Sequence, residues 1–246
     1  MRFNFWQMVN NQPLSNLKYS QPTNIFCNLP LEIFCTLCYN LDMNGYDFDN
    51  TILKGNCWRR FYFYCLVRFP YIALLLVVQV FFALCYLLHL IDNRKFSSVM
   101  SWYLVFIPNK QKQVEKFWDK NQKHIKKWYL DQRRDDDVVI SASPRFLVEP
   151  MCKRLGIKCI ASEMNIKTGQ YTGPYYYGPM KVYGYNLHCP DAPFKTYYSD
   201  SFTDAPMWQV VEEGWLVDGE TAVLCYKDGK PLDAYEKHKR KKYWRL

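Results

Sequence analysis

The most informative gap in this sequence is the lack of a compact cysteine framework. Ten cysteines are scattered along 246 residues and do not stand at the close, regular spacings of a small disulfide-stapled domain. We therefore expect reduced thiols, and the lone C-x-x-C of Cys35 and Cys38 favours a structural or accidental pair over zinc or redox chemistry. A nucleic-acid-binding motif is also missing. The net charge of +9 alone does not identify a nucleic acid as the partner, and we expect none.

Residues 1–42 lack both a secretory pattern and a periodic apolar pattern. No basic stretch precedes an unbroken apolar run, and Pro13, Pro22 and Pro30 interrupt the apolar runs that exist. We expect a poorly structured leader. The alternative is that translation begins at Met43 and that the leader is never made.

The composition nevertheless predicts a globular protein with a real core. A chain of this length fits one domain with an insertion or two small domains. Hydrophobic residues make up 49% and aromatic residues 18%, which is high for a soluble enzyme and indicates contact with something apolar. The positive charge is compatible with phosphate ligands or an anionic membrane surface.

Two aspartates one residue apart, Asp47 and Asp49, are the first candidate site. On an extended backbone their side chains project to the same side about 6.6 Å apart, a gap that suits a phosphoryl group. One carboxylate could attack phosphorus while the other handles the proton of the leaving group. Because an isolated D-x-D-x-T is usually a solvated turn, this motif needs partners elsewhere in the chain.

The stretch from Tyr71 to Ile91 lacks Asp, Glu, Lys and Arg. A run of this length passes the usual test for a transmembrane helix. A single crossing would separate Asp47 from the motifs after residue 130, and the apolar patch 99–107 is too short and too polar to return. We therefore predict either a buried helix of an inserted cap or a re-entrant or interfacial helix, with Arg68 and Arg94 at the headgroups.

A lysine-rich segment follows, in which Val114, Trp118, Ile125 and Tyr129 recur at helical spacing. This pattern predicts an amphipathic basic helix. Its basic side is either a solvated face of the cap or a surface that attracts anionic lipid or substrate. The segment 227–246 is basic too, which favours a solvated tail over a membrane or partner contact.

The stretch 138–156 reads as a strand, a turn and a helix. Val138 to Ile140 is a buried strand, Ser143 before Pro144 is a favoured helix start, and Gly156 is placed to end the helix. The turn would expose the Ser141 hydroxyl beside backbone N–H groups, an arrangement that suits an anion.

Weaker signals complete the chain. Residues 167–169 resemble a hairpin turn, and 196–199 read as a short strand. A helix is expected near Pro206, with Asp204 placed to cap it, and a last strand is expected around 215–217.

In this order, the motifs resemble the haloacid dehalogenase-like phosphohydrolase superfamily, in the branch of phosphoserine phosphatases and bacterial phosphatidylglycerophosphate phosphatases. The resemblance runs from about Met43 to Gly219 and is far more specific as an ordered set than in any one part. Its four parts are Asp47-Phe48-Asp49-Asn50-Thr51, Val139-Ile140-Ser141-Ala142-Ser143, Lys181, and Ser199-Asp200-Ser201-Phe202-Thr203-Asp204. The resemblance implies an α/β fold, a doubly wound parallel sheet that is Rossmann-like, with a helical cap inserted after the aspartate pair.

The resemblance also implies catalytic roles. Asp47 would be the nucleophile that forms an aspartyl-phosphate, and Asp49 would protonate the leaving oxygen and later activate water. Ser141 and Lys181 would hold the phosphoryl oxygens.

A cation is implied as well, because aspartates that converge on a phosphate repel one another and the substrate. Mg²⁺ would take a carboxylate oxygen of Asp47, the backbone carbonyl of Asp49, and Asp200. Asp204 would orient Lys181 or a metal-bound water.

Two places depart from the family pattern. Asn44 and Gly45 give a weaker strand into Asp47 than an apolar run would. Lys181 follows Pro179 and Met180 where the family would start a helix with charged residues, so Lys167 and Lys195 are its rivals.

We therefore predict a core of 43–57 and 131–226, a helical cap of 58–130 and a basic tail of 227–246. The predicted activity is Mg²⁺-dependent phosphomonoester hydrolysis, with an amphiphile such as phosphatidylglycerophosphate as substrate because the cap is apolar and basic. The alternatives are a small-metabolite phosphatase of the phosphoserine type, a phosphomutase-like transferase, and a catalytically silent membrane-associated scaffold. The expected location is cytoplasmic, with contact to the cytoplasmic face of the membrane as the open question.

Overall fold

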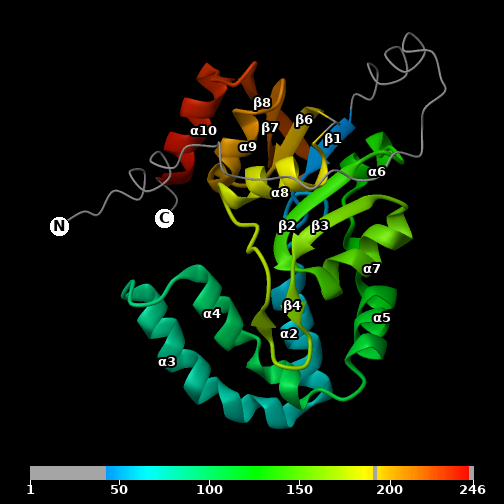
Figure 1. The fold of residues 1–246 in the computed structure, drawn as a ribbon, viewed down its shortest axis with the longest axis vertical. Coiled ribbons are helices and arrows are strands. Elements are labelled where there is room, and N and C mark those ends of the chain that lie inside the picture. Colours follow the sequence, from blue (N-terminus) through cyan, green and yellow to red (C-terminus); the bar gives the residue numbers. More distant parts are fainter. Residues whose placement is uncertain (1–42, 191–192, 244–246) are drawn as a thin grey trace, which may run out of the picture. The chain divides into compact units, whose positions relative to one another are not determined.

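Seven strands form one sheet in the order β3-β2-β1-β6-β7-β8-β9 (Figure 1). The computed structural model describes residues 43–190 and 193–243, so the predicted leader and the pair Cys35 and Cys38 lie outside the described residues. The strands from β3 to β7 in this order are parallel, and β8 and β9 add an antiparallel edge. The predicted α/β class with a doubly wound parallel sheet is confirmed.

The strand bounds are β1 (Met43–Tyr46), β2 (Val138–Pro144), β3 (Lys158–Ser162), β6 (Phe194–Ser199), β7 (Glu213–Asp218), β8 (Thr221–Lys227) and β9 (Lys230–Pro231). A separate antiparallel hairpin pairs β4 (Met164–Asn165) with β5 (Gln170–Tyr171), at the turn expected around residues 167–169.

Both faces of the sheet are covered. Successive side chains of β2 alternate, so Val139 joins one apolar core while Val138 and Ile140 join the other. The first core packs against α7 (Arg145–Leu155), and the second packs against α8 (Met180–His188). The near-continuous apolar run of β2 follows from burial on both sides.

Asn44 and Gly45, which depart from the apolar strand expected before Asp47, lie at the centre of the sheet in β1. Asn44 in β1 is satisfied there, because its amide donates to Asp137 at 3.4 Å and its oxygen accepts from Thr196 at 2.7 Å. At Gly45 an added Cβ would lie 2.5 Å from the Phe194 ring, so the close approach of that side chain requires glycine. The β1 sequence is therefore shaped by its neighbours rather than by strand propensity.

Residues 227–243 are not simply the basic tail that the sequence predicted for 227–246, because they contain β9 and a helix. The strand around 215–217 is β7, and it is followed by β8, β9 and α10 (Asp233–Tyr243). Tyr235 in α10 packs edge-on against Tyr226 of β8, with ring centroids 5.0 Å apart. The basic residues that predicted a solvated tail therefore belong in part to a helix with an aromatic anchor. Between β6 and β7 lie η6 (Phe202–Asp204) and α9 (Ala205–Trp208), the helix expected near Pro206.

A helical insertion separates β1 from β2 (Figure 1). Its elements are α2 (Cys57–Arg68), η3 (Pro70–Leu75), α3 (Leu76–Leu87), α4 (Asn93–Met100), η4 (Trp102–Phe106), α5 (Lys110–Asn121), η5 (Gln122–His124) and α6 (Lys127–Gln132). The predicted amphipathic helix is thus divided by η5 into α5 and α6. Its apolar residues are buried as the spacing predicted: Val114, Trp118, Ile125 and Tyr129.

The insertion begins and ends at the same short loop after β1. Leu53 forms a bridge with Ile125, the amide of Lys54 donates to the His124 carbonyl at 2.9 Å, and that of Lys126 donates to the Ile52 carbonyl at 2.8 Å. The two ends of the insertion are therefore closed on each other by main-chain contacts.

The apolar run corresponds to η3 and α3, and it is not a buried helix. Pro70–Leu87 is long and apolar enough to cross a membrane, and only 11% of this segment is buried. The buried-helix alternative from the sequence is therefore wrong. The spacing of apolar residues could not indicate which side of the helix is exposed, because almost every position in the run is apolar.

Candidate active site

A polar pocket lies at the carboxyl ends of β1, β2 and β6. Asp47 follows β1 directly, Ser141 lies near the end of β2, and Asp200 follows β6. Because parallel neighbouring strands end at the same edge of the sheet, their final residues meet there. The pocket has a volume of about 280 Å³.

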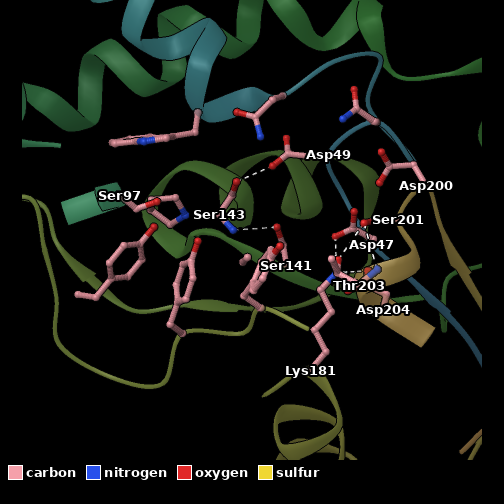
Figure 2. Close-up of a pocket in the computed structure, with 18 residues that line it drawn as sticks. Asp47, Asp49, Ser97, Ser141, Ser143, Lys181, Asp200, Ser201, Thr203 and Asp204 are labelled. Atoms are coloured by element: carbon pink, nitrogen blue, oxygen red, sulfur yellow. Dashed lines mark hydrogen bonds and ion pairs between the residues drawn. The ribbon is translucent and has the colours of Figure 1, made fainter. Parts of the chain in front are cut away.

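Lys181 joins two aspartates in the pocket (Figure 2). It enters from the first turn of α8, and its Nζ lies 2.6 Å from Asp47 Oδ1 and 2.7 Å from Asp204 Oδ2. The Ser199 hydroxyl donates to the same Asp204 oxygen at 2.7 Å. Lys181 is 3% exposed, so these ion pairs are shielded from water and from salt.

Asp49 points to the other side of the pocket, toward the helical insertion (Figure 2). Its Oδ2 accepts a hydrogen bond from the Ser143 hydroxyl at 2.5 Å, and its Oδ1 accepts one from the backbone N–H of Cys57 at 2.6 Å. Cys57 is the first residue of α2, so the carboxylate caps the positive end of this helix. The side chain is thereby fixed between the sheet and the insertion.

The loop after Asp49 is a compact turn that positions the strand ends. Asn50 adopts a left-handed conformation with φ of 57°, which Asn tolerates better than most residues. The hydroxyl of the buried Thr51 accepts a hydrogen bond from the Asp200 amide at 2.9 Å. The Lys126 ammonium donates to the Asn50 carbonyl. The loop is thus fixed on one side by Asp200, which follows the sheet strand β6, and on the other by Lys126 at the end of the insertion.

Burial dominates the electrostatics of the site. It raises the pKa of Asp47 to about 8 against the opposing charge of Lys181, and the negative charges of Asp204 and Asp200 raise it further. Burial likewise raises the pKa of Asp49, although the Cys57 N–H and the Ser143 hydroxyl oppose it. For Lys181 burial works against the charge, but Asp204 and Asp47 outweigh it, so its pKa lies well above the ordinary value. The site therefore concentrates negative charge around one cation.

The structure brings all six residues predicted for the site into one pocket. They are Asp47, Asp49, Ser141, Lys181, Asp200 and Asp204. The rival Lys167 is exposed in the β4–β5 hairpin, and Lys195 lies within β6 and does not line the pocket. The roles assigned to the six residues stay predictions.

Sequence reasoning misplaced one residue and missed others. Ser143 was expected to cap a helix, but β2 runs on to Pro144, α7 starts at Arg145, and the hydroxyl instead binds Asp49. Ser199 and Thr51 were quoted in motifs without a role, because nothing in the sequence shows which carboxylate or amide a hydroxyl will meet. The side chains that form the rest of the wall were not foreseen either: Trp58, Ser97, Tyr171, Tyr175 and Tyr177.

The donor set fits a hard divalent cation only if small-molecule ligands complete it. Among the described residues, no three His, Cys, Asp or Glu side chains converge closely enough to hold a metal by themselves. Mg²⁺, however, typically takes one or two carboxylates and completes its shell with water and substrate phosphate. Asp47 and Asp200 supply two carboxylates within electrostatic reach of each other, in a pocket with more acidic groups than basic ones. These residues fit the ion that the sequence predicted.

The comparisons with known proteins identify the family. Residues 45–209 match the family described as haloacid dehalogenase-like hydrolase. The matched region covers most of the chain and contains every predicted site residue, so the chain belongs to the haloacid dehalogenase-like hydrolase family. The predicted family is confirmed. A search of curated proteins gave no match.

Two solved structures share the fold at low sequence identity, and a third shows a weaker similarity. A protein of unknown function from Bordetella pertussis Tohama I is 15% identical, with a TM-score of 0.62 over 82% of this chain and 96% of that one. A family hydrolase from Salmonella enterica subsp. enterica serovar Typhi is 10% identical, with a TM-score of 0.52 over 69% of this chain and 60% of that one. A phosphoserine phosphohydrolase-like protein from Francisella tularensis subsp. tularensis SCHU S4 is 12% identical, with a TM-score of 0.47 over 70% and 85%.

Proposed function

We propose that this protein is a Mg²⁺-dependent phosphomonoesterase that works through an aspartyl-phosphate on Asp47. The observation that carries the proposal is the division of the aspartate pair. Asp47 is held by Lys181 at the sheet side, while Asp49 is held by Ser143 and the Cys57 N–H at the insertion side. Two carboxylates in different environments can take different roles in one reaction.

In the first step an Asp47 oxygen attacks phosphorus and the bond from phosphorus to the ester oxygen breaks. The leaving oxygen takes the proton of Asp49, whose pKa burial shifts upward, in the direction that a general acid needs. Lys181 and the Ser141 hydroxyl contact the phosphoryl oxygens and stabilise the charge that develops on them.

In the second step water attacks the phosphorus of the aspartyl-phosphate. Asp49, now a carboxylate, takes a proton from this water, the bond from phosphorus to Asp47 breaks, and inorganic phosphate leaves. When bound through Asp47, Asp200 and the Asp49 carbonyl, Mg²⁺ supplies charge neutralisation between the carboxylates and the phosphate. Asp204 orients Lys181 through its ion pair.

For the substrate we favour a phosphate ester whose alcohol part is amphiphilic. Besides its charged residues, the pocket is lined by Trp58, Tyr171, Tyr175 and Tyr177, which offer apolar surface with polar tips. Ser97 of the insertion lines it as well. A lipid phosphate such as phosphatidylglycerophosphate combines both chemistries, whereas a small polar ester such as phosphoserine would leave the aromatic side chains unused.

The test is hydrolysis of p-nitrophenyl phosphate with Mg²⁺ and with EDTA, by wild type and by Asp47→Asn. We expect the substitution to lower kcat at least about 10³-fold, because it removes the nucleophile with little change in shape. Asp135→Asn is the matched control, since that side chain is 91% exposed and lies outside the pocket. Equal turnover by Asp47→Asn and wild type would overturn the nucleophile assignment. A panel of lipid and soluble monoesters then ranks the substrates by kcat/KM.

A further inference from the structure

The outer side of η3 and α3 is an exposed apolar surface. Five of its side chains, spaced three and four residues apart, are more than half exposed: Leu74, Val77, Phe81, Leu84 and Leu88. Val105 and Phe106 of the neighbouring η4 are also more than half exposed, and the Tyr71 hydroxyl of η3 donates to the Phe106 carbonyl at 2.8 Å. We call these seven residues the α3 face. Contiguous apolar surface of this kind marks a binding site rather than an ordinary solvated helix.

The inner side of the same helix is attached to the protein. Gln79 is 3% exposed, accepts from the Tyr62 hydroxyl at 2.7 Å and donates to the Met100 carbonyl at 3.4 Å. Tyr86 stacks on Phe96 of α4 at 4.6 Å between ring centroids. The helix therefore has one side attached to α2 and α4 and one side whose apolar side chains are more than half exposed.

Charge around the α3 face has one dominant sign. Between residues 68 and 112 the charged residues are Arg68, Asp92, Arg94, Lys95, Lys110 and Lys112, five of them basic. Arg68 precedes the apolar run, and Arg94 and Lys95 follow it in α4. Basic side chains at both ends of an apolar helix place positive charge where anionic headgroups lie when the helix rests in a membrane interface.

The sheet excludes one way of meeting a membrane. β1 and β2, which flank the insertion, are hydrogen-bonded neighbours, and Asp47 and Ser141 line the same pocket. A single bilayer crossing between them would pull these strands to opposite sides. The inner side of α3 cannot face lipid either, because its residues Gln79 and Tyr86 contact α2 and α4. A helix lying in the plane of the interface satisfies both conditions.

We propose that the α3 face docks on the surface of an anionic lipid bilayer, with its apolar side chains below the headgroups. The same helix pair borders the pocket, since α3 packs on α4, and α4 carries Ser97 in the pocket wall (Figure 1). Docking would therefore bring the mouth of the pocket close to the lipid surface. The proposal concerns binding and does not depend on the proposed chemistry.

The test is sedimentation of the full-length protein with vesicles of phosphatidylcholine alone and of phosphatidylcholine with phosphatidylglycerol at equal amounts. We expect binding to the mixed vesicles that weakens in high salt. The triple variant Val77→Ser, Phe81→Ser, Leu84→Ser should bind at least about tenfold more weakly, because it replaces three apolar side chains at the centre of the α3 face that would enter the bilayer. The matched control is Leu130→Ser, Leu187→Ser, Val210→Ser, which changes three similarly exposed apolar residues elsewhere and should bind like wild type.

Both variants keep residues 1–42, so any contribution of that segment to binding is the same in each. The midpoint of urea unfolding without lipid should be nearly equal in all three proteins, which separates loss of docking from loss of folding whether or not the protein hydrolyses phosphate esters. Equal vesicle binding by wild type and the α3 variant would overturn the proposal, as would no binding by wild type. Light scattering without lipid tests whether a second copy of the chain binds the α3 face instead. A dimer that the α3 variant converts to a monomer would assign the face to a second copy of the chain instead.

Discussion

The pocket and the α3 face differ in which side chains they bury and which they expose. In the pocket, charged groups are buried, and Lys181 finds its partners in Asp47 and Asp204 within the same chain. On the α3 face, apolar side chains such as Val77 and Leu88 are 79% and 69% exposed. The described residues that carry buried side-chain polar atoms without partners are Tyr103, Trp128, Tyr129 and Trp208, and none of them lines the pocket. The charged groups of the pocket thus find partners within the fold, whereas the α3 face stays exposed among the described residues.

The largest expected effect comes from removing the cation of the pocket. Lys181→Met leaves Asp47 and Asp204 buried without their counter-charge, so the free energy of unfolding should fall by about 3–5 kcal/mol. The same change should lower kcat at least about 10²-fold, because Lys181 no longer contacts the phosphoryl group. Urea unfolding and steady-state kinetics measure the two effects. Lys167→Met, at an exposed lysine outside the pocket, is the control and should change neither.

A buried charge far from the pocket provides the second comparison. Burial raises the pKa of Asp137 to about 6, against hydrogen bonds from the Arg134 backbone and the Asn44 amide. The folded state therefore holds this proton more tightly than the unfolded state does. Its stabilising contribution is full below about pH 4 and is lost as the pH rises to about 6, amounting to about 1–3 kcal/mol.

To check this prediction, the free energy of unfolding is measured from pH 4 to pH 7 for wild type and for Asp137→Asn. The difference between the two proteins should change over this range. The difference removes the contributions of Asp47 and Asp49, which have the same sign. A difference that stays constant across this range would contradict the assignment.

Ser143→Ala should have an intermediate effect. It removes the hydrogen bond to Asp49 that opposes the rise of the pKa caused by burial, so the pKa of Asp49 should increase further. We expect kcat/KM to fall about tenfold and its alkaline limb to move to higher pH. A pH–rate profile distinguishes this from simple loss of stability, which would lower the profile without moving the limb. Ser143→Thr should restore part of the activity because it keeps the hydroxyl.

The smallest expected effect is on the stability of the α3 variant. Serine at positions 77, 81 and 84 replaces side chains that are exposed in the fold, so the free energy of unfolding should change by less than about 0.5 kcal/mol per substitution. Urea unfolding without lipid measures it. A loss of several kcal/mol would show that the α3 face is part of the protein's own packing, and it would remove the contrast with the pocket.

The sequence predicted the site better than the surfaces. Asp47, Ser141 and Asp200 could be placed together because strand ends of a parallel sheet share an edge, and their order along the chain matched a known family. The destination of the Ser143 hydroxyl could not be predicted, since a serine beside a proline is an equally good helix cap until the partner carboxylate is positioned.

The prediction of a buried helix for the apolar run was wrong for a different physical reason. Hydropathy reports the character of the side chains in Pro70–Leu87 but not which of them find a neighbour, and burial depends on the rest of the insertion. Asn44 and Gly45 show the reverse case. They weaken strand propensity in β1, yet Asp137, Thr196 and Phe194 make them suitable for its centre.

The closure of the insertion on itself makes it a module that leaves and rejoins the sheet at one place. Leu53 and Ile125 are neighbours across a bridge although more than seventy residues separate them, so both ends of the module are fixed at the loop after β1. The module also packs on α7, where the Trp118 indole donates to the Leu147 carbonyl at 2.7 Å. It reaches the site through the Cys57 amide on Asp49, the Lys126 ammonium on the Asn50 carbonyl, and the pocket-lining side chains of Trp58 and Ser97. A new preference for substrate or surface can therefore arise in the module while the chemistry at the strand ends stays the same.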